Sequence, residues 1–374
     1  MTKLTDLCDI QYGYAFDSGA FTDDESYPQL VRIRDVKRGY SETYYNGEYP
    51  EEYVLSAGDL LIGMDGEFNI ARWKVDGALL NQRVCKIIAK DNADEEFLRF
   101  ALSKALKAIE DRTSFATVKH LSAKELNKLE IPVPPYEEQK KISEILHRLE
   151  KVIDIRQNEL ASLDELIKAR FVELFGTLDN PSQEFEKATL KELCNKITDG
   201  KHGGCAQEEG TDRYFVGARE IFDDEVHYET APQINIEEFE KDYKRCNVEI
   251  GDFLIVNTGA TIGKSAIASD IRTEHTLLQK SVALLKVKRE VLNPVFLKWC
   301  YRVNTKMYLV ESASAQPNLL LSKINSTVIY VPDISLQKQF ADFVEQVDKS
   351  KVVVQKALNE TQTLFDSLMQ EYFG

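Results

Sequence analysis

The stretch IPVPPYEEQKKISEILHRLEKVIDIRQNELASLDELIKARFVELFG, from Ile131 to Gly176, decides the fold, because the end of the chain repeats it. A shift of 198 residues aligns the two copies without a gap, so that Pro134, Gln139, Lys140, Phe175 and Gly176 fall on Pro332, Gln337, Lys338, Phe373 and Gly374. Recurrence of this kind indicates a duplicated structural unit. We therefore predict that the chain consists of two copies of one plan.

A long helix is predicted in each copy. In the first copy two acidic residues, Glu137 and Glu138, suit the positive end of a helix dipole, and no Pro or Gly follows until Gly176. Positions at alternating spacings of three and four then follow the pattern of a heptad seam, and seven of the nine are apolar in each copy. The polar exceptions are Arg156 and Arg170 in the first copy and Lys351 and Thr361 in the second. The seam positions are Leu146, Leu149, Ile153, Arg156, Leu160, Leu163, Ile167, Arg170 and Leu174 in the first copy, and Val344, Val347, Lys351, Val354, Leu358, Thr361, Phe365, Leu368 and Tyr372 in the second.

Each apolar seam needs a partner, and the nearest one is the other helix. At about 1.5 Å per residue, a helix of this length spans about 60 Å. Such a helix puts the second domain at its far end, and the second helix can pack along it only by running back. We therefore predict an antiparallel pair, over residues 136–176 and 335–374, that separates two domains. The alternative is two unrelated amphipathic helices, each packed on its own domain.

The two domains are predicted over residues 1–135 and 177–334. Both contain a Gly-Asp turn that leads into an apolar strand, at Gly58-Asp59 and at Gly251-Asp252. The expected fold class is α+β, with two similar strand-rich α/β domains, a pair of long antiparallel helices between them and a pseudo-twofold internal repeat. The loops differ where the framework agrees, which is typical of a duplicated recognition module.

The composition fits a soluble chain with two domains, since the 374 residues are 43% apolar and 29% charged. The amino-terminal residues lack the apolar segment of a secretion signal, and no apolar run approaches the length of a membrane span, so we predict a cytoplasmic protein without membrane contact. The six cysteines include no C-x-x-C pair, and the five histidines are scattered. This pattern indicates neither a zinc site nor a disulfide framework.

The net charge of −15 is unfavourable for a protein that binds nucleic acid. One segment in each domain reverses the sign, residues 72–90 in the first and 264–289 in the second, and the two segments occupy corresponding positions. Affinity for a polyanion depends on where Lys and Arg lie locally, so a basic face on an acidic body is compatible with DNA binding. The alternative is that both segments are charged hairpins without such a role.

Two motifs resemble nucleotide-binding or catalytic sequences but lack residues that the chemistry needs. The segment 259–265 resembles a phosphate-binding loop, but the required first glycine is replaced by Thr258. The segment 133–136, VPPY, resembles the active-site tetrapeptide of adenine methyltransferases, but Val133 replaces the Asn or Asp that holds the target amine. The carboxylates near Asp333 also lack the paired spacing of a metal nuclease. We therefore predict a binding protein rather than an enzyme.

Together these features resemble the specificity subunit of Type I restriction-modification systems. The resemblance covers essentially the whole chain. It is carried by the Gly-Asp strands at 58 and 251, by the IPVPPYEEQ and YVPDISLQKQ starts of the long helices, and by the Phe-Gly at the end of each copy. At the second helix start the residues DISL, 333–336, depart from the first copy, which leaves the exact helix start open.

The resemblance implies two target-recognition domains, each of which reads one half of a split DNA site. It implies no catalysis and no cofactor in this chain. The implied partners are double-stranded DNA, two methyltransferase subunits that bind S-adenosylmethionine, and restriction subunits that translocate DNA and use ATP and Mg. Two other classes stay open: an enzyme such as a methyltransferase, and a two-domain protein-binding scaffold, which fits the acidity better.

Basic and amide side chains in the two basic segments and in the divergent loops are the candidates for DNA contact. Lys and Arg hold phosphates, Arg reads guanine, and Gln or Asn reads adenine. The candidates are Arg72, Lys74, Asn81, Gln82 and Arg83 in the first copy, and Lys201, His202, Thr261, Lys264, Ser265, Gln279 and Lys280 in the second. No residue is predicted to be catalytic or to bind a cofactor or a metal.

Overall fold

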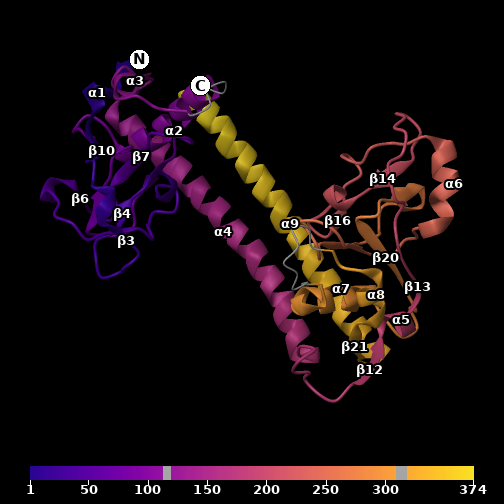
Figure 1. Ribbon diagram of the computed structural model, residues 1–374. Helices are drawn as coiled ribbons and strands as arrows, with labels where there is room; N and C mark the ends of the chain where they lie inside the picture. Colours follow the sequence, from indigo (N-terminus) through magenta and orange to yellow (C-terminus); the bar gives the residue numbers. More distant parts are fainter. Residues whose placement is uncertain (113–118, 309–317) are drawn as a thin grey trace. The chain divides into compact units, whose positions relative to one another are not determined.

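The computed structural model describes residues 1–112, 119–308 and 318–374. The chain divides into two compact units, the first made of Met1–Gln157 and Gln355–Gly374 and the second of Asn158–Val354. Each unit therefore contains part of each of two long helices, α4 (Tyr136–Phe175) and α9 (Ile334–Phe373), which are labelled in Figure 1.

The first unit is built on a four-stranded antiparallel sheet with the order β2-β10-β7-β8. These strands are β2 (Cys8–Tyr12), β10 (Val84–Ala89), β7 (Leu60–Gly63) and β8 (Ile70–Arg72). Smaller ladders join β1 (Thr2–Lys3) to β11 (Glu130–Ile131), β3 (Phe21–Thr22) to β5 (Tyr44–Tyr45), and β9 (Ala78–Leu80) to β4 (Leu30–Val31) and β6 (Val54–Leu55). The shorter helices are α1 (Leu4–Leu7), α2 (Glu95–Arg112) and α3 (Ala123–Asn127).

The second unit has the corresponding sheet, with the order β13-β20-β17-β18. These strands are β13 (Cys194–Asp199), β20 (Val282–Val287), β17 (Phe253–Val256) and β18 (Ser265–Ile267). Smaller ladders join β12 (Glu186–Thr189) to β21 (Val328–Val331), β14 (Tyr214–Val216) to β19 (Thr276–Leu278), and β15 (Ile221–Phe222) to β16 (Glu225–Val226). The shorter helices are α5 (Leu190–Leu193), α6 (Ile236–Cys246), α7 (Pro294–Val303) and α8 (Leu321–Ser326).

The long helices contribute to the apolar core of each unit. In the first unit Ile142 and Leu146 of α4 and Met369 of α9 are buried in the core that contains α2 and the sheet. In the second unit Phe171 and Phe175 of α4 share a core with α7, the sheet and three buried residues of α9, which are Phe340, Val344 and Val347. Parts of both long helices are thus packed into the core of each unit.

Contacts inside the second unit give the direction of the two helices. Lys351 Nζ of α9 lies 2.7 Å from Asp164 Oδ1 of α4. Seven residues further along α4, the ring of Phe171 lies 5.4 Å from that of Phe340, which is earlier in α9. Rising numbers in α4 therefore meet falling numbers in α9, so the two helices run antiparallel in this unit.

A buried glutamine fixes the first turn of each long helix to its α/β body. Gln139 is 1% exposed; its Oε1 accepts a 2.9 Å hydrogen bond from the backbone N–H of Asp94, and its Nε2 donates to the carbonyls of Asn92 and Pro134. The second unit repeats the arrangement, with Gln337 bound to Asn293, Val291 and Pro332. This explains why a polar residue recurs at matching positions in both copies.

We expect Gln139→Ala to lower the free energy of unfolding of the first unit by about 1–3 kcal/mol, because it leaves a buried N–H and two carbonyls without their partner. Gln157→Ala is the matched control, since Gln157 lies exposed on the same helix. Denaturant unfolding of the two variants checks the prediction. Equal stabilities would mean that the buried hydrogen bonds contribute nothing.

Candidate nucleic-acid interface

Several loops meet at one end of the strands of the four-stranded sheet in each unit. We call this end of the sheet the loop edge. In the first unit the last residues of β2 and β7, Tyr12 and Gly63, pair with Cys85 and Val84 at the start of β10. Antiparallel pairing therefore gathers the loop after β2, the loop after β7 and the residues before β10. The loop edge comprises residues 13–16, 64–69 and 81–83 in the first unit, and 200–204, 257–264 and 279–281 in the second.

The two loop edges have the same backbone hydrogen bonds. In the first unit the backbone N–H groups of Gly13, Tyr14 and Gln82 donate to the carbonyls of Val84 (3.0 Å), Leu80 (2.9 Å) and Tyr14 (2.7 Å), respectively. In the second unit the backbone N–H groups of Gly200, Lys201 and Lys280 donate to the carbonyls of Val282 (3.2 Å), Leu278 (2.7 Å) and Lys201 (3.0 Å), respectively. Both glycines are required by this close approach. A Cβ atom would lie 2.0 Å from the Asn81 carbonyl oxygen at Gly13, and 2.1 Å from that of Leu278 at Gly200. We call this set of repeated backbone hydrogen bonds the frame. The frame is the same in both units, and the side chains that it carries differ.

The structure brings all seven candidates of the second copy to or beside the loop edge, but not all of them are accessible. Lys264 and Lys280 are exposed, and neither has an ion-pair partner among the residues that the structure describes. Ser265 is buried in β18, and the Gln279 side chain packs against Gly217, where a Cβ atom would lie 2.5 Å from Gln279 Oε1. Lys264 and Lys280 are therefore the candidates of this copy whose charge is open to solvent.

Lys201 and His202 already have carboxylate partners. Lys201 Nζ lies 2.7 Å from Asp242 and 3.3 Å from Glu238, both on α6, and the hydrogen bond with Asp242 raises the pKa of Lys201 above its ordinary value. His202 Nε2 lies 3.3 Å from Asp199. The positive charge of Lys201 is therefore largely offset by Asp242 and Glu238, and Asp199 occupies the ring nitrogen of His202.

Lys264 and Ser265 also line a cavity of about 350 Å³ in the second unit, beside Thr261. Arg302 and Tyr308 line the same cavity, and the guanidinium of Arg302 is paired with Asp224. Gly263 is required here, because a Cβ atom would meet the Tyr308 ring at 2.4 Å. Packing of Tyr308 on Gly263 thus supports the turn that presents Lys264.

In the first unit the loop edge carries three candidates. Asn81 is buried, and its Oδ1 accepts a 2.9 Å hydrogen bond from the backbone N–H of Gln82, so it supports the loop. Gln82 and Arg83 are exposed. Arg83 lies next to Asp65 and His120, two residues that are not among the candidates predicted from the sequence. In the sequence, Asp65 precedes Gly66 as Thr258 precedes Gly259, and both glycines have a positive φ.

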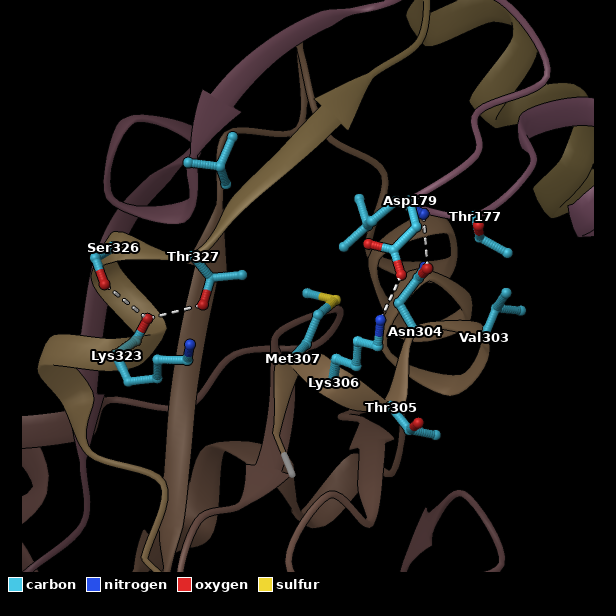
Figure 2. A pocket seen from close by; sticks show the side chains of 12 residues that line it. Thr177, Asp179, Val303, Asn304, Thr305, Lys306, Met307, Lys323, Ser326 and Thr327 are labelled. Carbon is cyan, nitrogen blue, oxygen red and sulfur yellow. Dashed lines mark hydrogen bonds and ion pairs between the residues drawn. The ribbon is translucent and has the colours of Figure 1, made fainter. Parts of the chain in front are cut away.

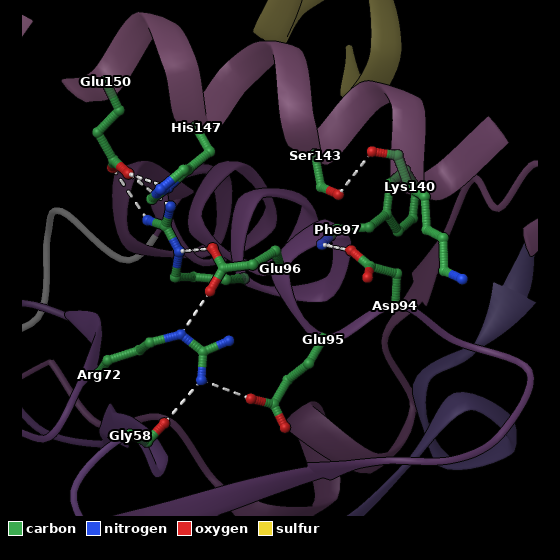
Figure 3. A network of polar contacts seen from close by, with 11 residues as sticks. Gly58, Arg72, Asp94, Glu95, Glu96, Phe97, Lys140, Ser143, His147 and Glu150 are labelled. Atoms are coloured by element: carbon green, nitrogen blue, oxygen red, sulfur yellow. Dashed lines mark hydrogen bonds and ion pairs between the residues drawn. The ribbon is translucent and has the colours of Figure 1, made fainter. Parts of the chain in front are cut away.

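Arg72 and Lys74 lie elsewhere. Arg72 ends β8 at the opposite end of the sheet from the loop edge, and its guanidinium is bound by Glu95, by Glu96 and by the carbonyl oxygen of Gly58 (Figure 3). The network continues to α4 through Arg99 and Glu150, whose atoms lie 2.6 Å apart. Arg72 thus ties β8 to α2, and Arg99 ties α2 to α4. Lys74 is exposed and likewise lies outside the loop edge.

Strand pairing also corrects the alignment of the two copies at this point. Ile62 pairs with Ile70 in the first unit, and its counterpart Ile255 pairs with Ser265 in the second. The residue that corresponds to Lys264 is therefore Asn69 rather than Arg72. The second unit thus has a lysine at the position where the first unit has an asparagine.

Another cavity of the second unit, of about 380 Å³, is shown in Figure 2, and none of its lining residues belongs to the loop edge. Its walls are residues 177–179, the end of α7 with the turn after it, and the end of α8. Lys306 Nζ lies 2.7 Å from Asp179, and the backbone N–H of Leu178 donates to Asn304. These bonds close the loop that follows α4, and no candidate residue for DNA contact lies in this cavity.

Within the described ranges, no cluster of three or more His, Cys, Asp or Glu side chains is placed to hold a metal ion. In the same ranges, no helix has both the length and the apolar character that crossing a membrane requires.

Comparison with known proteins shows the family. The family model of the Type I restriction modification DNA specificity domain matches residues 1–165 and 182–361. The EcoBI specificity subunit of Escherichia coli is 30% identical, with 99% of this chain and 84% of the relative covered. The MjaVIII specificity subunit of Methanocaldococcus jannaschii is 22% identical, with 84% and 79% covered.

Solved structures share the fold. The S subunit of a Type I restriction-modification system from M. genitalium has a TM-score of 0.59 at 16% identity and covers 100% of this chain and 95% of its own. A chain from a structure that describes complex assembly and conformational transition of the type I R-M system has a TM-score of 0.58 at 19% identity, with 99% and 95% covered.

Two α/β units with one backbone frame at their loop edges, together with two long helices, define a duplicated recognition protein. The chain belongs to the family of Type I restriction-modification DNA specificity subunits. Specificity subunits are the non-catalytic members of these systems, so this chain is not an enzyme, and the resemblance stated from the sequence is confirmed.

Proposed function

We propose that this chain recognises a bipartite DNA target, with the loop edge of each unit contacting one half-site, and directs methyltransferase and restriction subunits to it. The observation that carries the proposal is the repeated frame: identical backbone hydrogen bonds present Tyr14, Gln82 and Arg83 in one unit and Lys201, Lys280 and Ser281 in the other. A constant scaffold with different side chains is what two readers of different half-sites require.

The partner subunits supply the chemistry in this proposal. Two methyltransferase subunits bind S-adenosylmethionine, and restriction subunits use ATP and Mg, while this chain holds no cofactor. Support comes from the relatives, which are named as specificity subunits, and from the similar structure described in terms of assembly of the type I R-M system. Because such a complex acts on cellular DNA, we propose a cytoplasmic location for the chain.

The long helices set the spacing between the half-sites. We propose that α4 and α9 pair as an antiparallel coiled coil, and that the two copies are related by a pseudo-twofold axis. The target-recognition domains are then residues 1–135 and 177–334, and the helices are 136–176 and 335–374. The same sheet order in both units and the matched glutamines, Gln139 and Gln337, support this arrangement.

Local charge at the loop edge makes DNA binding compatible with a net charge of −15. Lys264 and Lys280 are exposed at the loop edge of the second unit, so their ammonium groups are available to phosphate oxygens. The remaining acidity suits basic surfaces of partner subunits. It also suits the other candidate, a scaffold that binds only protein.

We expect Lys264→Ala and Lys280→Ala each to make DNA affinity less dependent on salt. Each lost phosphate contact lowers the slope of log K against log salt by about 0.9. The measurement is binding of the full chain, assembled with its methyltransferase subunits, to its target duplex between low and moderate salt. The matched control is Lys288→Ala, because Lys288 follows the opposite end of β20.

Slopes that match the wild-type slope would remove both lysines from the phosphate contacts. Random-sequence duplex separates the two candidate functions. A DNA reader retains its preference for the target duplex over random duplex, whereas a protein scaffold shows no such preference and leaves its protein partners bound in the presence of either DNA.

A further inference from the structure

A charged cluster stands at the loop edge of the first unit, where Arg83 of the basic segment meets two residues outside that segment, Asp65 and His120. Arg83 Nε lies 3.6 Å from Asp65 Oδ2, and Arg83 Nη1 lies 3.3 and 3.4 Å from the two ring nitrogens of His120. Asp65 is hydrogen bonded to His120 Nδ1. Three side chains from three separate loops therefore meet at one point, and the guanidinium lies against the imidazole ring.

The backbone of Arg83 is held in an unusual conformation. Its φ angle is 71°, in the left-handed region that a residue with a side chain adopts at an energetic cost. The frame maintains this conformation, since the backbone N–H of Met64 donates to the Arg83 carbonyl at 2.8 Å. The Arg83 side chain remains 53% exposed. A strained residue that stays open to solvent at a loop edge is typical of a functional position.

The second unit has the same frame with different chemistry. The backbone N–H of Asn257 donates to the Ser281 carbonyl at 2.9 Å, as Met64 does to Arg83. The backbones of Asp65 and His120 form an isolated β-bridge in the first unit, and those of Thr258 and Asn318 form one in the second. Thr258 Oγ1 lies 3.3 Å from Asn318 Oδ1. Arg83, Asp65 and His120 are thus replaced by the uncharged Ser281, Thr258 and Asn318.

We propose that Arg83 is a specificity-determining residue of the first unit that reads a guanine, with Asp65 and His120 as positioning residues. The proposal rests on the proposed function. The planar fork of a guanidinium matches the N7 and O6 acceptors of guanine in the major groove. Asp65 and His120 restrain the arginine beforehand, so less side-chain entropy is lost when it binds. A purely structural ion pair would not require half of the arginine side chain to remain exposed.

The test compares base preferences. The full chain, assembled with its methyltransferase subunits, selects from a duplex library in which one half-site is randomised, and the bound DNA is sequenced. With Arg83→Gln we expect the preference for guanine at one position to fall about 10- to 100-fold, with the other half-site unchanged. Arg83→Lys retains the charge but not the planar fork, so we expect it to keep the overall affinity and to weaken the guanine preference less than Arg83→Gln does.

A second variant and a matched control separate reading from folding. Asp65→Asn leaves Arg83 in place but loosens it, so we expect a smaller loss at the same base. Arg72→Gln is the control, because Arg72 is also an ion-paired arginine of this unit but lies at the opposite end of the sheet. We expect Arg72→Gln to lower thermal stability without altering base preference.

Each outcome is distinguishable. A wild-type complex that selects no half-site contradicts the proposed function itself. A wild-type complex that selects a split motif, together with an Arg83→Gln complex that selects the same motif equally strongly, overturns the inference alone. Loss of preference for a base other than guanine overturns the assignment to guanine, and equal loss in Arg72→Gln assigns the effect to stability.

Discussion

Inserting four residues after Gln157 and four after Val354 is expected to lengthen the preferred spacer between the half-sites and to leave both half-sites unchanged. These points lie where each long helix passes from one unit to the other. Four residues add about 6 Å of helix, which corresponds to about two base pairs of DNA. Four residues also rotate the rest of each helix by one full turn and about 40° more. Matched insertions in both helices therefore keep the two seams facing each other.

Sequencing of DNA selected from a library with variable spacers checks this result. The control inserts the same residues in α4 alone, which removes the match between the two seams and is expected to destabilise the chain. An unchanged spacer preference in the double insertion would contradict the role of the helices as a spacer.

Replacing Phe340 with alanine is expected to lower the free energy of unfolding of the second unit by about 3–5 kcal/mol. Phe340 is fully buried, and its ring lies 5.4 Å from that of Phe171 and 5.6 Å from that of Phe175. The substitution leaves a cavity where α4, α9 and α7 share their core. Val353→Ala is the control on the same helix, because Val353 is 68% exposed, and we expect a change within about 0.5 kcal/mol.

The two tryptophans allow each unit to be followed separately. Trp73 lies in the first unit, and Trp299 lies in the second, 6.4 Å from the Phe340 ring. In a Trp73→Phe background, denaturant unfolding followed by tryptophan fluorescence reports the second unit. Unfolding midpoints for Phe340→Ala and Val353→Ala that coincide would contradict the role given to this aromatic core.

Periodicity made the long helices predictable. Over this length, only an α-helix brings apolar residues at alternating spacings of three and four onto one face. Helices Tyr136–Phe175 and Ile334–Phe373 lie where the two seams were predicted. The Gly-Asp turns likewise precede β7 and β17, because a turn followed by an apolar run favours a buried strand. These features depend on residues close together in the chain.

The residues of the site were less predictable, because strand pairing decides which side chains meet at the loop edge. Charge alone selected Arg72, but the pairing of β8 with β7 sends its side chain to the end of the sheet where Glu95 and Glu96 lie. Asp65 and His120 are 55 residues apart and meet only through tertiary structure. The positive φ of Arg83 likewise depends on neighbouring strands rather than on its own sequence.

The central claim is that one chain reads two separate half-sites for a DNA methyltransferase, and mapping of methyladenine across the genome tests it most directly. Cells with and without this chain are compared. We predict that the chain adds methylation at one split motif, with two defined parts and an unspecified spacer of fixed length. Methylation at a single continuous motif, or a pattern that does not change when the chain is removed, would contradict the account.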